Sequence, residues 1–323
     1  MYLHFSLYFL LFFLILEIVI LFSLFLRSIY KYFFLKELSL IDRYGEDTWA
    51  VITGGSSGQG RQFALKLAER GFNILFIGSH RSKNVMKEIK NLFPDIKVMH
   101  VYKNFCHSFK KDFFKDIEKI FNKLNLKISI LINNVAHRTA WDPYHKMPVK
   151  LIKDTISCGT LVQAQLTHMI IPFFLKRSNK SAIINITAQC NHPNFGPGMI
   201  LSNDISVPYL SVYEASNAFG YYHSNSIHKE YKNKIDILNI TPGAVITENT
   251  GYLKNTLFSI TSDKFVNNII RFMGNVNGTT CGCWGHAISV YFVNLFPFYK
   301  DYILHQTGKT IAHEYMNNKR KKY

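Results

Sequence analysis

One short segment near residue 50 constrains the fold of this chain more than any other part of the sequence. There an apolar, β-branched run ends in a glycine-rich turn, Thr53-Gly54-Gly55-Ser56-Ser57-Gly58-Gln59-Gly60, and a helical pattern follows from residue 61. Glycine allows a tight turn and a close approach of the backbone to a pyrophosphate, and the amides that start the next helix favour an anion. The segment therefore predicts a phosphate-binding turn, whose candidate contacts are Thr53, Gly54, Ser56, Ser57, Gly58 and Gly60.

Between residues 48 and 275, short apolar runs alternate with amphipathic segments. The predicted strands cover residues 49–53, 73–78, 96–102, 128–133, 182–187 and 235–240. The predicted helices cover residues 62–70, 83–92, 108–124, 149–176 and 209–231. This alternation is typical of an α/β fold with a doubly wound parallel sheet and helices on both faces. We therefore expect one large domain at residues 48–275.

The N-terminus carries a hydrophobic stretch from residue 3 to residue 26 that is interrupted only by His4, Ser6, Glu17 and Ser23. As a helix this stretch would be about 36 Å long, which is enough to span a bilayer with some tilt. No basic segment precedes it and no small-residue cleavage site follows it, which favours an uncleaved anchor over a signal peptide. We therefore predict a transmembrane anchor at residues 1–30 and a polar linker at residues 31–47.

The distribution of charge and cysteine indicates the surroundings of the domain. Arg27, Lys31 and Lys36 follow the apolar stretch directly, which predicts a domain on the cytosolic side. The five cysteines have no framework spacing, so neither structural disulfides nor a metal site is expected. The formal net charge of +17 comes without a nucleic-acid-binding signature, so we expect lipid membrane and no nucleic acid as its partner.

Residues 276–323 form a C-terminal tail with an apolar segment at 287–298 and a basic end. The apolar segment is too short and too interrupted to span a bilayer. It fits a membrane-surface helix, a lid over a hydrophobic entrance or an ordinary core helix, and the sequence leaves these alternatives open.

Three further segments follow the glycine turn in a recognisable order. The fourth predicted strand ends in Asn133-Asn134-Val135-Ala136, the sixth is followed by Pro242-Gly243-Ala244-Val245-Ile246-Thr247, and Tyr213 begins the long helix between the fifth and sixth strands. Together with the glycine turn they resemble the short-chain dehydrogenase/reductase superfamily. The resemblance implies a Rossmann-type fold and a catalytic role for Tyr213. It also implies cofactor contacts from Asn133, Val135, Ala136, Pro242, Gly243 and Thr247, with Thr247 at the nicotinamide carboxamide.

The anchor, the segment at 44–51 and the basic tail narrow this resemblance to the membrane-bound 17β-hydroxysteroid dehydrogenases and very-long-chain 3-oxoacyl-CoA reductases. It implies a hydrophobic small-molecule substrate such as an acyl-CoA or a sterol. It further implies the endoplasmic-reticulum membrane, for which Lys319 and Lys321 match a dilysine retrieval signal. A homodimer through the long helices is an arrangement that the resemblance allows.

The residues after the second predicted strand favour NADP(H) over NAD(H) as the cofactor. An acidic residue there would accept the ribose hydroxyls of NAD, whereas a basic residue would meet the additional phosphate of NADP. The segment at 78–83 has no carboxylate, and Arg81 is the expected phosphate contact.

The resemblance also implies four catalytic side chains, of which only the tyrosine is present. The positions of the lysine, the serine and the helix asparagine hold Asn217, Ala188 and Gly159. Thr187 carries a hydroxyl, but strand alternation predicts that it points to the opposite face. Three hypotheses follow. The chain is an NADP(H)-dependent reductase of a lipid-type ketone with Tyr213 as its acid, or a catalytically impaired cofactor-binding or scaffold pseudo-enzyme. The third hypothesis is a lipid-binding module that keeps the cavity without the cofactor.

Overall fold

The computed structural model of the chain describes residues 2–136, 142–189, 206–247, 256, 258–295, 299, 302–306, 308–310 and 312–313. The domain is built on a seven-stranded sheet in the order β3-β2-β1-β4-β5-β6-β9, and every neighbouring pair of strands is parallel. The strands are β1 (Trp49–Thr53), β2 (Asn73–Gly78), β3 (Val98–Tyr102), β4 (Ile128–Asn133), β5 (Ser181–Ile186), β6 (Ile235–Ile240) and β9 (Gly278–Thr280). The strand order reverses between β1 and β4, and parallel sheets bind ligands in the crevice at such a point.

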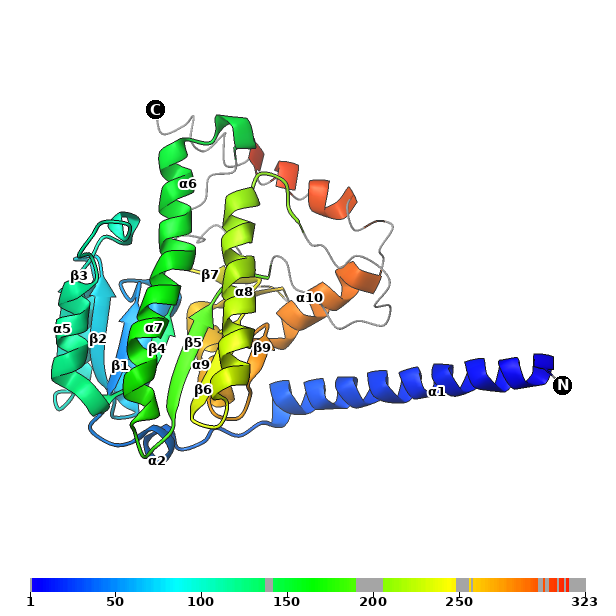
Figure 1. Cartoon of the computed structure of the whole chain (residues 1–323), viewed down its shortest axis with the longest axis horizontal. Helices are drawn as coiled ribbons and strands as arrows, with labels where there is room; N and C mark the ends of the chain where they lie inside the picture. The colour runs from blue at the N-terminus through cyan, green and yellow to red at the C-terminus, as the bar shows by residue number, and fades with distance from the viewer. Residues whose placement is uncertain are drawn as a thin grey trace.

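Helices cover both faces of this sheet (Figure 1). One core cluster joins the sheet to α3 (Gly58–Glu69), α4 (Ser82–Leu92) and α9 (Ser262–Phe272). The other joins it to α5 (Lys115–Leu124) and α7 (Val162–Leu175), with α8 (Ser211–Tyr231) packed beside β6. Because both faces are covered, all residues of β1, β2, β4 and β6 are buried. The predicted doubly wound α/β fold is confirmed.

Several elements differ from the sequence-based expectation. The predicted helix at 149–176 consists of α6 (Val149–Ile156), a π-helical turn (Ser157–Leu161) and α7. The predicted helix at 108–124 begins only at Lys115, because Asp112 has a φ of 70°, outside the range of a right-handed helix. Three strands of three residues, β7 (Ala244–Ile246), β8 (Ser259–Thr261) and β9, were not predicted, since so short a run shows no alternation.

The N-terminal helix α1 (Tyr2–Ile29) projects away from the domain (Figure 1). Its large apolar side chains from Tyr8 to Leu26 are exposed where they are described. By length and composition, two described helices could cross a bilayer, Leu11–Phe34 and the partly buried Val149–Leu175. The second packs against the sheet as α6 and α7, so the N-terminal helix is the one that suggests membrane anchoring.

The segment that follows α1 packs onto the domain. A π-helical turn (Tyr30–Phe34) continues α1, and α2 (Leu40–Tyr44) lies closer to the sheet. Tyr32, Leu40 and Tyr44 are buried, and Arg43 donates to the Asp236 carboxylate of β6 through Nε at 2.6 Å. The region predicted as a linker therefore belongs to the packed structure.

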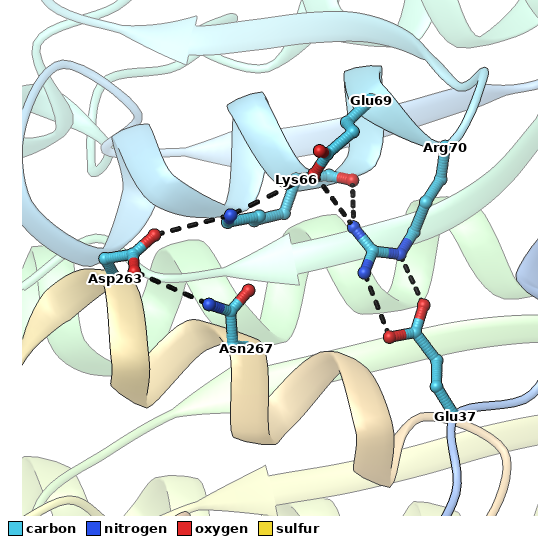
Figure 2. A network of polar contacts seen from close by, with 6 residues as sticks. All are labelled: Glu37, Lys66, Glu69, Arg70, Asp263 and Asn267. Carbon is cyan, nitrogen blue, oxygen red and sulfur yellow. Dashed lines mark hydrogen bonds and ion pairs between the residues drawn. The ribbon is translucent and has the colours of Figure 1, made fainter.

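A network of surface charges ties the same segment to two helices (Figure 2). Arg70 at the end of α3 donates to Glu37 through Nε at 2.5 Å. Lys66 of α3 lies 3.4 Å from the Asp263 carboxylate of α9. Each exposed pair contributes little alone, but together they connect the segment after α1 to α3 and α9.

Candidate active site

The glycine turn lies at the carboxyl end of β1, where α3 begins at Gly58. Gly54 and Gly58 have φ angles of 66° and 53°, a left-handed conformation that side chains disfavour. A β-carbon added at Gly60 would lie 2.3 Å from the carbonyl oxygen of Gly54, so this position accepts only glycine. Ser56 and Ser57 are half-buried within the turn, and Ser57 makes no side-chain cap to α3. These residues form a cradle whose backbone has room for a bound group.

Hydrogen bonds hold this turn against the end of β4. The Thr53 hydroxyl oxygen accepts from the backbone amides of Asn134 and Val135 at 2.9 and 3.1 Å. The Asn134 side chain donates to the carbonyl oxygens of Thr53 and Gly54, each at 3.2 Å. The two predicted cofactor segments therefore form one edge of the site.

A small pocket next to this edge brings the predicted catalytic positions together. Its described lining contains Asn133, Val135 and Ala136 after β4, Gly159 from the π-helical turn, and Tyr213 and Asn217 from α8. The pocket has a volume of about 20 Å³, enough for about one water molecule. Asn133 and Asn217, which are 84 positions apart in the chain, thus meet at the carboxyl edge of the sheet.

Asn133 presents an unused acceptor in the wall of this pocket. Its side chain is 5 % exposed, and its Nδ2 donates to Asn185 Oδ1 at 2.8 Å and to Thr167 Oγ1 at 3.3 Å. Its Oδ1 is buried and has no hydrogen-bond partner among the described residues. A buried polar atom without a partner is costly, so this oxygen indicates a place where a bound molecule donates a hydrogen bond.

The segment after β6 closes the site from the other side. The side-chain Cγ2 of Thr247 would lie 3.0 Å from a β-carbon added at Gly58. Pro242 and Gly243 precede it, and the amide of Gly243 donates to Nδ1 of His286 at 3.1 Å. The predicted nicotinamide segment therefore faces the glycine turn.

The loop after β2 carries positive charge at the same edge. Arg81 immediately precedes α4 and is exposed. Its neighbour His80 stacks on Tyr102 of β3, with ring centroids 3.8 Å apart. Burial lowers the pKa of His100, which lies beside them on β3. An exposed arginine and two aromatic rings form a surface suited to a phosphate and a base.

Internal contacts involve two of the positions that were predicted to be substituted in the catalytic set, Gly159 and Asn217. A β-carbon added at Gly159 would lie 2.9 Å from Cβ of Ser216, so α8 fills the place of a side chain there. The Asn217 amide donates to its own helix at the Tyr213 carbonyl, at 2.8 Å. None of the described lining residues carries a positive charge.

Thr187 differs from its prediction. It lies in the wall of the pocket, but its hydroxyl donates into the protein, to the Ile240 carbonyl at 3.1 Å. Ala188 follows it without a hydroxyl, and the described lining of the pocket does not include it. Neither residue therefore offers a hydroxyl donor to a carbonyl group in the pocket.

Sequence reasoning missed four polar or thiol side chains that line the pocket: Thr155, Cys158, Gln163 and Ser216. The side-chain amide of Gln163 lies 3.1 Å from Nδ1 of His223, whose pKa is lowered by burial. The π-helical turn shifts the register of the helix here, and the sequence contains no pattern that predicts this shift.

The parallel sheet, the glycine turn and the pocket at its edge together define a Rossmann-type α/β domain. Residues 48–257 match the family model described as short chain dehydrogenase. The match covers more than half of the sequence, and the chain belongs to this family.

Two relatives extend this assignment. The chain is 32 % identical to 17-beta-hydroxysteroid dehydrogenase type 3 of Homo sapiens over 262 residues, covering 79 % of this chain and 77 % of the relative. It is 31 % identical to very-long-chain 3-oxoacyl-CoA reductase of Rattus norvegicus over 255 residues, covering 76 % of this chain and 74 % of the relative. The chain is thus a short-chain oxidoreductase related to steroid and 3-oxoacyl-CoA reductases.

Solved structures support the fold. A short-chain dehydrogenase from Sphingobium yanoikuyae in complex with NADPH has a TM-score of 0.60 at 21 % identity, covering 72 % of this chain and 87 % of that chain. A structure from work on the stereoselectivity of 7beta-hydroxysteroid dehydrogenase has a TM-score of 0.64 at 17 % identity. The match covers 79 % of this chain and 93 % of that chain.

Proposed function

We propose that this chain is a membrane-anchored, NADP(H)-dependent reductase of a lipid-type ketone, such as a 3-oxoacyl-CoA or a steroid. The observation that carries the proposal is the meeting of the glycine turn, the unpartnered Asn133 oxygen and Tyr213 at one sheet edge. The substrate class is supported by the names of the two relatives and by the apolar helix at the N-terminus.

The residues present fit a dinucleotide. The left-handed Gly54 and Gly58 and the crowded Gly60 leave the backbone free to approach a pyrophosphate. Exposed Arg81 would meet the additional phosphate of NADP, and no carboxylate in segment 78–83 competes for a ribose. When bound, NADPH supplies the hydride that reduces a carbonyl carbon.

Tyr213 is the residue that would deliver the proton. Its hydroxyl would protonate the carbonyl oxygen as this oxygen gains charge, so that the ketone becomes an alcohol. A cation beside a tyrosine stabilises its anion, but position 217 holds a neutral amide that bonds to its own helix. We therefore expect slow turnover.

A second candidate function, a cofactor-binding protein without turnover, is favoured by one contact. Ser216 fills the space beside Gly159, so the pocket lacks room for the asparagine that the family resemblance implies. In this alternative the glycine turn retains its ligand and Tyr213 has no chemical role.

Oxidation of NADPH by the detergent-solubilised full chain, with a panel of 3-oxoacyl-CoA and steroid ketones, distinguishes the two functions. The reductase predicts ketone-dependent oxidation that Tyr213→Phe abolishes. Tight NADPH binding with no oxidation for any ketone would favour the second function. Oxidation that Tyr213→Phe leaves unchanged would refute the role of Tyr213.

The anchor would place the domain on the cytosolic face of the endoplasmic-reticulum membrane. Arg27, Lys31 and Lys36 support this orientation, and Lys319 and Lys321, which lie outside the described residues, support the compartment. Protease treatment of sealed microsomes should degrade the domain without detergent, and full protection would contradict the orientation.

We also propose a membrane-surface position for the helix that begins the C-terminal tail, and a homodimer. Helix α10 (Trp284–Leu295) begins beside the π-helical turn that continues α1, with the Trp284 and Phe33 rings 5.9 Å apart, which supports a membrane-surface position. Tyr144, Val149 and Tyr222 are exposed on and beside α6 and α8, which supports docking of a second copy there. Val149→Glu should then reduce the mass measured for the protein in detergent to that of one chain.

A further inference from the structure

A buried histidine at the start of α10 holds the segment that follows β6. His286 is 1 % exposed. Its Nδ1 accepts from the Gly243 amide at 3.1 Å, and its Nε2 lies 3.2 Å from the carbonyl oxygen of Ala244. A carbonyl oxygen accepts only, so Nε2 carries the proton and Nδ1 is free to accept. The two ring nitrogens therefore form hydrogen bonds with two successive residues of one backbone segment, Gly243 and Ala244.

A second residue, Gln189 in the segment after β5, holds the same segment through its backbone and packs its side chain against it. The backbone amide of Gln189 donates to the Pro242 carbonyl at 3.0 Å, and its Nε2 donates to the His286 carbonyl at 2.6 Å. A β-carbon added at Gly243 would lie 2.6 Å from Gln189 Oε1 and 3.1 Å from the His286 ring. Gly243 is thus enclosed between the two side chains.

The clamped residues lead directly to the glycine turn. Ala244 begins β7, and Thr247 follows the end of this strand. Thr247 packs against Gly58, with its Cγ2 3.0 Å from the place of a β-carbon there. Because β7 is only three residues long, fixing Gly243 and Ala244 fixes where Thr247 lies.

We propose that His286 is a positioning residue for the nicotinamide half of the cofactor, acting through the backbone of Gly243 and Ala244. This inference rests on the proposed NADP(H) function and on the role of Thr247 in it. Burial lowers the pKa of His286, which keeps the ring neutral and its Nδ1 able to accept. The described lining of the pocket beside Tyr213 does not include His286.

Three substitutions of His286 test its two hydrogen bonds individually. His286→Phe keeps an aromatic ring but removes both bonds and orphans the Gly243 amide. His286→Asn places an acceptor oxygen where Nδ1 lies, and His286→Gln places a donor nitrogen near Nε2. Since an orphaned buried donor is the larger loss, we expect the asparagine variant to bind NADPH better than the glutamine variant and the phenylalanine variant worst.

The test compares two ligands bound by the full chain in detergent. NADPH reaches the 242–247 segment, whereas adenosine 2′,5′-bisphosphate carries only the adenosine half. His286→Phe should raise the Kd for NADPH about tenfold to a hundredfold and leave the Kd for the bisphosphate unchanged, while His286→Asn should restore much of the loss.

Other outcomes overturn the inference. An equal weakening of both ligands would assign His286 a merely structural role, and so would unchanged binding of both. If His286→Phe fails to fold, the order of the asparagine and glutamine variants for NADPH decides, and a better glutamine variant would contradict the clamp. A wild-type chain that binds neither ligand would refute the proposed cofactor function itself, and the inference with it.

Discussion

Ser216 occupies the space that a side chain at position 159, the predicted place of the helix asparagine, would need. The π-helical turn brings Gly159 against α8, and a β-carbon there would lie 2.9 Å from Cβ of Ser216. In an unobstructed helix, alanine is more stable than glycine by about 1 kcal/mol. The contact reverses this preference.

We therefore expect Gly159→Ala to lower the free energy of unfolding by about 1–3 kcal/mol, because the added β-carbon overpacks the contact. Chemical denaturation measures this change. The double variant Gly159→Ala with Ser216→Gly should show a favourable coupling between the two sites. A stabilised Gly159→Ala protein would mean that α8 does not fill the space.

The vacant acid–base positions give a gain-of-function prediction. Asn217→Lys together with Ala188→Ser restores the cation and the hydroxyl that the family resemblance implies, and each such group contributes about 10²–10⁴ in rate. Because members of one catalytic unit act together, we expect the double variant to exceed either single variant in NADPH oxidation. Addition of Tyr213→Phe should abolish the gain. No increase in the double variant would indicate that the pocket is unsuited to reduction.

The sequence predicted which residues meet at the site better than it predicted what surrounds them. Tyr213, Asn217 and Gly159 were expected together and line one pocket. The filling of that pocket by Ser216 and the inward bond of the Thr187 hydroxyl depend on how α8 packs against the π-helical turn and on β6. Such contacts between distant segments have no local sequence signal.

At the scale of elements, four strands have the predicted bounds: β1, β2, β4 and β6. Their apolar runs are bounded by polar or glycine residues and are buried on both faces. The expected helix at 149–176 was wrong only in its interior, where the π-helical turn interrupts it. The packing of α2 against the sheet depends on tertiary contacts, and its five residues show no local pattern that predicts them.

The buried Asp236 carboxylate is the main polar link between α2 and the sheet. It accepts from Arg43 Nε at 2.6 Å and from the Tyr44 hydroxyl at 3.0 Å, and the residue is 3 % exposed. Asp236→Ala leaves both donors without their acceptor, so we expect it to lower the free energy of unfolding by about 3 kcal/mol.

Glu69 provides the matched control for this prediction. Its side chain is 54 % exposed, and its carboxylate lies 3.5 Å from Arg70 in the network of Figure 2. Glu69→Ala should change the free energy of unfolding by less than about 0.5 kcal/mol. Equal effects of the two variants in urea denaturation would contradict the role given to Asp236.

At the scale of the whole molecule, the apolar helix and the nucleotide site are separate parts of one chain. Helix α1 projects from the domain (Figure 1), and the glycine turn lies at the carboxyl edge of the sheet. Removal of residues 2–26 should therefore release the protein from membranes and leave NADPH affinity within about twofold of the full chain. Membrane flotation and a binding titration measure both properties. Flotation of the shortened chain would show that other surfaces suffice for membrane attachment.

The proposed function requires that the cradle between β1 and α3 binds the cofactor, and a calorimetric NADPH titration of the full chain and of Gly60→Ala measures this binding. A β-carbon at Gly60 would lie 2.3 Å from the Gly54 carbonyl oxygen, which must distort the turn. We expect saturable binding by the wild-type chain and at least about a tenfold higher Kd for Gly60→Ala, with the domain still folded by circular dichroism. No binding by the wild-type chain at millimolar NADPH, or equal affinity in both proteins, would contradict it.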